Sequence, residues 1–99
     1  MRKIIEQITD TTYKLSQIAQ EGYEVGEIAK IWSIIPIGDS EDITYLEATS
    51  RCVLEVSELV DKKFPELTRL QRTAKKFRLM AKLLDSKADL LDNLYLQDV

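Results

Sequence analysis

The sequence contains no histidine and a single cysteine, Cys52, among its 99 residues. The lack of histidine removes the most common general base and the most common zinc ligand. One cysteine cannot form a disulfide within the chain, which is typical of proteins from a reducing compartment. We therefore expect a cytoplasmic protein that has neither a disulfide framework nor a histidine-based zinc site.

Long apolar runs are also missing. The densest apolar stretch, residues 28–37, is far shorter than the roughly 20 residues that a membrane-spanning helix needs, so we expect no membrane contact. Only three glycines and two prolines interrupt the chain, and no segment alternates as a strand does. This scarcity of breaks favours long helices.

The last third of the chain carries the most regular pattern in the sequence. Apolar residues follow alternating spacings of three and four over four heptads, which is typical of a helix that packs lengthwise in a coiled coil. One heptad position holds small residues and the other holds large ones, so a neighbouring helix could approach closely. We expect this pattern, here named the seam, to face the core. Its members are Leu67, Leu70, Ala74, Phe77, Ala81, Leu84, Ala88, Leu91 and Tyr95.

Pro36 and Pro65 divide the chain into three predicted helices, over about residues 2–35, 40–64 and 66–96. A kink or short break near residues 21–26 is compatible with this division, because a glycine costs about 1 kcal/mol inside a helix. Short connections favour three long antiparallel helices, up-down-up, in a single all-α domain. So short a chain forms only a modest core, and we expect self-association as a homodimer to complete a larger bundle.

Two apolar segments outside the seam are candidates for the contact between subunits. Residues 31–37 are too apolar to form only one face of a helix, and tryptophan is favoured at interface centres. A second apolar stripe runs beside the seam, where two neighbouring helices could cover both stripes only by straddling the third. The predicted interface residues are Trp32, Ile34, Ile35, Ile37, Met80, Leu83, Leu90 and Leu94.

The net charge of −3 hides an uneven distribution along the chain. Residues 1–60 contain five basic and eleven acidic side chains, whereas residues 61–99 contain nine basic and six acidic ones. Asp85, Asp89 and Asp92 share a face beside the seam, downstream of a basic run over residues 62–82. That run could contact nucleic-acid phosphates, but we favour pairing with the two acidic helices. The candidate anion contacts are Arg69, Arg72, Lys75, Lys76, Arg78 and Lys82.

Three carboxylates, Glu21, Glu24 and Glu47, should converge if the first two predicted helices form an antiparallel hairpin. Glu21 and Glu24 lie three residues apart on one helix face, and Glu47 lies nearly level with them. Carboxylate oxygens suit Mg²⁺, so these residues form the candidate metal site. A competing set is disfavoured, because its halves are offset by about eight residues, roughly 12 Å along the helices. That set is Glu24, Glu27, Glu55 and Glu58.

The segments Gln20–Val25 and Leu46–Ser50 resemble the MazG-type all-α nucleotide pyrophosphohydrolases. That family carries a Glu-Glu-x-x-Glu motif on one helix and Glu-x-x-Asp on the next, and these acids hold Mg²⁺ against the phosphates of a nucleotide. The chain departs from the pattern, because Gln20 and Ser50 stand where the family has acids. The resemblance covers residues 20–60, and it implies magnesium and nucleotide hydrolysis.

We rank three functions on these observations. The first is a non-enzymatic α-helical interaction protein that acts as a homo-oligomer and needs no cofactor. The second is a divergent MazG-like nucleotide pyrophosphohydrolase, or a nucleotide-binding relative, with an incomplete Mg²⁺ site. The third is an accessory factor that meets nucleic acid through residues 62–82. The two missing acids place the enzyme second.

Overall fold

The computed structural model describes residues 2–35 and 42–97, with the side chains of residues 10–35, 47 and 49–93. This part of the chain folds into α1 (Arg2–Ala19), α2 (Val25–Ile34), α3 (Asp42–Lys63) and α4 (Arg69–Gln97). The prediction of an all-α protein is confirmed. Within the described residues, no helix combines the length and the apolar character that crossing a membrane requires.

The first predicted helix is in fact two helices, because the chain turns at Gly22. Gly22 adopts a φ of +123°, which residues with a side chain rarely adopt. The N–H groups of Gly22 and Tyr23 both donate to the carbonyl oxygen of Ala19, at 3.1 and 2.8 Å, and so end α1. α2 begins after Glu24, whose backbone N–H donates a 3.0 Å hydrogen bond to the Glu27 carboxylate.

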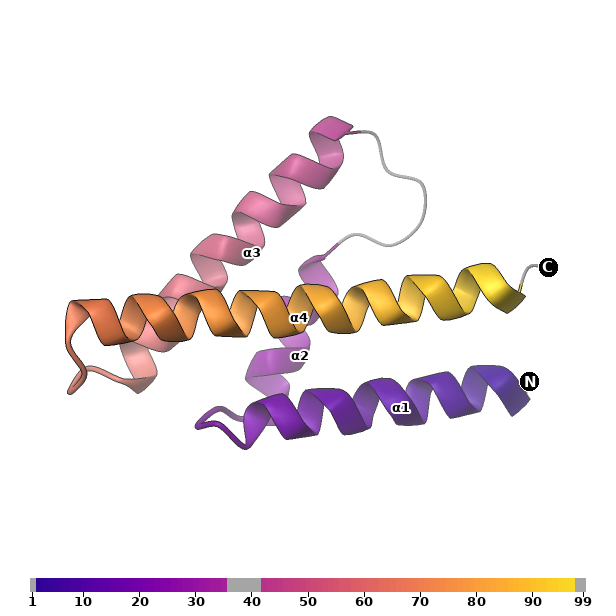
Figure 1. Ribbon diagram of the computed structural model, residues 1–99, viewed down its shortest axis with the longest axis horizontal. Helices are drawn as coiled ribbons and strands as arrows, with labels where there is room; N and C mark the ends of the chain where they lie inside the picture. The colour runs from indigo at the N-terminus through magenta and orange to yellow at the C-terminus, as the bar shows by residue number, and fades with distance from the viewer. Residues whose placement is uncertain (1, 36–41, 98–99) are drawn as a thin grey trace.

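This extra turn changes the direction of the helices relative to one another. α1 and α4 lie side by side and run antiparallel, with α2 and α3 behind them (Figure 1). An up-down-up array of three helices would have placed the first and last helices parallel. The prediction of that array is therefore wrong, because the turn at Gly22 makes α2 a separate helix and α1 runs antiparallel to α4.

The core lies between the two layers, and every helix contributes to it. Its largest fully buried side chains are Ile28, Cys52, Val56, Val60, Leu79 and Leu83. The molecule is flat, with extents of 48 × 31 × 17 Å and a radius of gyration of 14.5 Å. A compact domain of this length would have a radius of gyration of about 13 Å. α4 lies in the front layer, and α2 and α3 pack against α4 from behind (Figure 1).

Candidate interaction surface

Most of the seam lies on the outside of α4, although Leu84 packs against the core. Leu70 is 82% exposed and Phe77 is 70% exposed, although both are large apolar side chains. Ala81 and Ala88 are exposed as well. The remaining described members of the seam are half-buried: Leu67, Ala74, Leu84 and Leu91. The side chain of Tyr95 lies outside the described residues.

The opposite side of α4, here named the inner face, packs on the other helices. Leu79 and Leu83 are fully buried there, and Met80 packs at the edge of the core. The Met80 sulfur also lies 3.7 Å from the Cys52 sulfur on α3. The prediction that the seam faces inward is therefore wrong, because α4 has two apolar faces and the core uses the less regular one.

Several residues that the sequence predicted to lie at the subunit interface lie in or against the chain's own core instead. Leu83 is fully buried and Ile35 is 4% exposed, so neither has apolar surface left for a partner. Trp32 and Met80 pack against the same core, while Ile34 and Leu90 are half-buried. Ile37 and the side chain of Leu94 lie outside the described residues.

Four of the six predicted anion contacts have partners within the chain. Arg72 Nε and Lys76 Nζ both pair with Asp61 Oδ1, at 3.3 and 3.0 Å. Lys75 Nζ lies 4.3 Å from the ring centroid of Phe64, and Lys82 pairs with Glu21. Within the described residues, Arg69 and Arg78 form no ion pair. They remain the two cations of this set that are free to meet an external anion.

The carboxylates proposed as a metal site do not gather. Among the described residues, no group of three or more Asp, Glu or Cys side chains could hold a metal ion. Glu21 lies in the turn after α1, where it pairs with Lys82, while Glu24 starts α2 and Glu47 is exposed on α3. The hairpin argument required one continuous helix through Glu21 and Glu24, and the turn at Gly22 breaks it.

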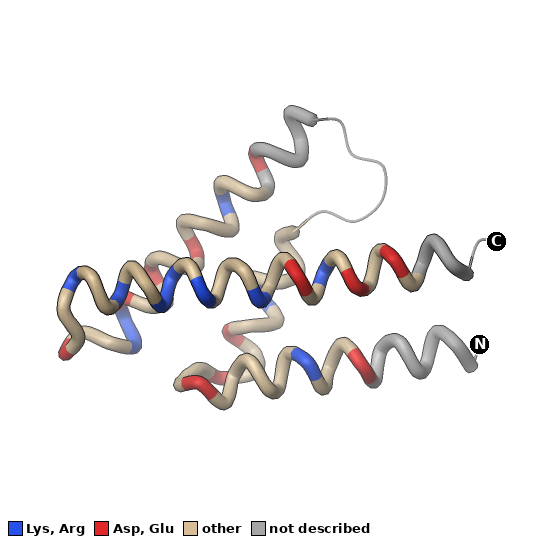
Figure 2. The backbone as a smooth tube through the Cα atoms, in the orientation of Figure 1, with Lys and Arg blue, Asp and Glu red and all other residues tan. Residues whose placement is uncertain are grey.

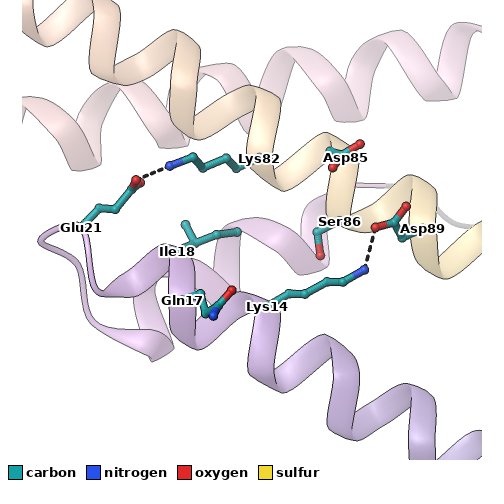
Figure 3. A pocket seen from close by; sticks show the side chains of 8 residues that line it. All are labelled: Lys14, Gln17, Ile18, Glu21, Lys82, Asp85, Ser86 and Asp89. Atoms are coloured by element: carbon teal, nitrogen blue, oxygen red, sulfur yellow. Dashed lines mark hydrogen bonds and ion pairs between the residues drawn. The ribbon is translucent and has the colours of Figure 1, made fainter.

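A groove of about 420 Å³ separates α1 from α4 (Figure 3). Lys14 of α1 pairs with Asp89 of α4 at 2.6 Å, and the Lys82–Glu21 pair spans the same gap. Ser86 lies at its floor, 6% exposed, and its hydroxyl has no partner among the described residues. Charges of both signs line the groove and largely neutralise each other. The two ion pairs link α1 to α4 across the groove.

Lys87 is a buried cation on the inner face of α4. The residue is 3% exposed, and its Nζ lies 3.4 Å from the ring centroid of Trp32. Burial lowers the pKa of Lys87 to about 8, because a charged amine is poorly solvated there. Within the described part, no carboxylate pairs with it. The sequence offered no signal for this placement, since Lys87 reads as one more helix cation.

No family model, curated protein or solved structure matches the chain.

Proposed function

We propose that the protein is a non-enzymatic helical interaction protein that assembles with itself through the seam. The observation that carries the proposal is the exposure of Leu70 and Phe77 on one regular stripe of α4. Burying a Leu or Phe side chain contributes roughly 1.5–3 kcal/mol. Large apolar side chains that stay exposed to water along one face of a helix are typical of a contact surface.

The arrangement favours this function over the two alternatives. The nucleic-acid hypothesis has less support, because four of its six cations already have partners in the chain. The MazG-like hypothesis needs Glu21, Glu24 and Glu47 close together, and they are not. A lone buried cysteine, Cys52, suits a reducing compartment, and this supports the proposal of a cytoplasmic location.

Sedimentation equilibrium at micromolar concentration tests the proposal. We expect the wild-type chain to associate and Phe77→Glu to be monomeric, because a carboxylate on the seam would be desolvated at the contact. Leu54→Glu is the matched control, since Leu54 is 64% exposed on α3 and lies outside the seam. A wild-type chain that stays monomeric would refute the proposal. Equal loss of association in both variants would move the contact away from the seam.

A further inference from the structure

We infer that the occupant of the seam is the α4 helix of a second copy, packed antiparallel about a twofold axis. The inference rests on the proposed function and specifies its geometry. In the proposed register, two residues face each other across the contact when their residue numbers add up to 158. Phe77 of one copy then packs against Ala81 of the other, and the reverse contact follows by symmetry.

The first argument is length. From Leu70 to Leu91 the seam covers about 32 Å of α4 at 1.5 Å per residue. A partner helix must be equally long to cover it, and α4, with 29 residues, is the longest helix in the described part of the chain. α1, α2 and α3 are shorter and are already packed within their own chain. A second α4 has both the required length and the same uncovered stripe.

The second argument is the fit of large side chains to small ones. The proposed register places Leu70 opposite Ala88 and Phe77 opposite Ala81, so the two exposed large residues meet the two exposed small ones. The half-buried members pair in the same way, with Ala74 facing Leu84. Such alternation fills an interface without voids or overlap. A hollow of about 460 Å³ lined by Leu67, Leu70 and Ala74, among others, would receive the second copy's α4.

The parallel arrangement fits poorly by the same test. In a parallel pair, each residue of the seam meets its own counterpart at the same level. Phe77 would meet Phe77, while Ala81 would meet Ala81 one turn further on. The first layer would be overfilled and the next would leave a void.

The third argument is charge. Along α4, basic residues gather in the first half, and acidic residues gather towards the end, apart from Lys87 (Figure 2). Antiparallel pairing places the basic half of each copy against the acidic half of the other. Arg78 and Asp85 are both exposed, and neither has an ion-pair partner within the described residues. They would form two symmetric pairs across the contact.

The direction of helical side chains supports these pairs. Measured along the helix axis, Arg78 and the second copy's Asp85 are offset by five residues, or roughly 7.5 Å. Helical side chains lean towards the N-terminus of their own helix, so these two lean towards each other in an antiparallel pair. The two Arg78 side chains, which differ by two residues in level, lean apart.

A charge-reversal cycle tests the pairing. We expect Arg78→Glu and Asp85→Arg each to raise the dimer dissociation constant at least about tenfold, and the double variant to restore it to within about threefold. Arg51→Glu on α3 is the matched control, because it makes the same charge change at an exposed site outside the seam. The double variant failing to recover would overturn the pairing.

Disulfide trapping tests the orientation independently of charge. We expect a mixture of Leu70→Cys and Ala88→Cys chains to form a mixed disulfide under mild oxidation, while each variant alone forms none. Disulfides within each variant alone would indicate a parallel dimer and overturn the inference, while leaving the proposed function intact. A persistent dimer without any cross-link would overturn the register. A wild-type chain without any association would refute the proposed function itself.

Discussion

The two faces of α4 differ in a way that reverses the usual relation between pattern and burial. The inner face packs into the core, although it is irregular and includes Ser86 and the buried Lys87. The seam is regular over four heptads, yet it leaves Leu70 and Phe77 largely in water. A regular stripe of this length would suit the long partner helix proposed above, whereas α2 and α3, which cross α4, need only a local patch on it. Regularity therefore reports the shape of the partner, not whether the partner belongs to the same chain.

Substitutions on the two faces should separate stability from association most strongly. Leu83→Ala on the inner face should lower the free energy of unfolding of the monomer by roughly 2–5 kcal/mol, because it leaves a cavity at a fully buried site. Phe77→Ala should change that free energy by less than about 0.5 kcal/mol, because the ring is already exposed. Urea unfolding, at a protein concentration below the dimer dissociation constant, measures both free energies. Similar losses in the two variants would mean that the faces are assigned the wrong way round.

The pH dependence of stability sharpens the comparison by probing the inner face alone. Unfolded Lys87 would titrate near 10.5, whereas the folded pKa is about 8. Between these values the unfolded chain binds more protons, so stability rises with pH, and below pH 8 the folded state carries the full cost of the buried charge. The cost is about 3 kcal/mol at 1.36 kcal/mol per pKa unit.

We therefore expect Lys87→Met to be more stable than the wild type at pH 7, with the difference shrinking as the pH rises from 8 to 10.5. Burial also raises the pKa of the neighbouring Cys52 thiol, so this group lowers the stability of the folded state as the pH rises above 9. Because Cys52 is present in both proteins, the quantity to measure is the difference in stability between them. Denaturant unfolding at several pH values measures it. A constant difference across this range would contradict the buried charge.

A smaller effect on stability is expected at the Gly22 turn, which joins α1 to α2 and so allows α2 to pack on the inner face of α4. Gly22→Ala should lower the free energy of unfolding by roughly 1–3 kcal/mol, because φ is positive there. The new Cβ would also lie 2.7 Å from Phe64 Cζ. Gly26→Ala is the matched control. A Cβ there meets nothing within 4 Å, and alanine should stabilise α2 by up to about 1 kcal/mol. Thermal unfolding measures both, and dimer dissociation constants should stay unchanged.

Helical periodicity predicted the buried residues well wherever a helix has one apolar face. Leu15 and Ile18 on α1, and Val56 and Val60 on α3, recur at helical spacings of three and four and lie in the core. Val53 does not, at 46% exposed, because α4 covers the neighbouring Cys52 side of α3 instead. On α4 the same reasoning failed, since two apolar faces compete and sequence alone does not say which one the chain covers.

The candidate site was predictable in composition but not in placement. The seam, its alternation of sizes and the basic and acidic halves of α4 can all be read from the sequence. The contacts between α1 and α4 could not be, because the Lys14–Asp89 pair depends on α1 running antiparallel to α4. That direction follows from the turn at Gly22, where the sequence indicated a weak point but not the separate helix α2 that follows it.

The contact between Lys87 and Trp32 should also make tryptophan fluorescence sensitive to the charge of Lys87. Trp32 is the only tryptophan in the chain, so its emission arises from one place, the junction of α2 with α4. A positive charge above an indole ring changes the energy of its excited state, and the amine lies 3.4 Å from the ring centroid. We therefore expect intrinsic fluorescence to follow the ionisation of this one interior amine without any added dye. Dimerisation at the seam, on the other side of the helix, should leave that signal unchanged.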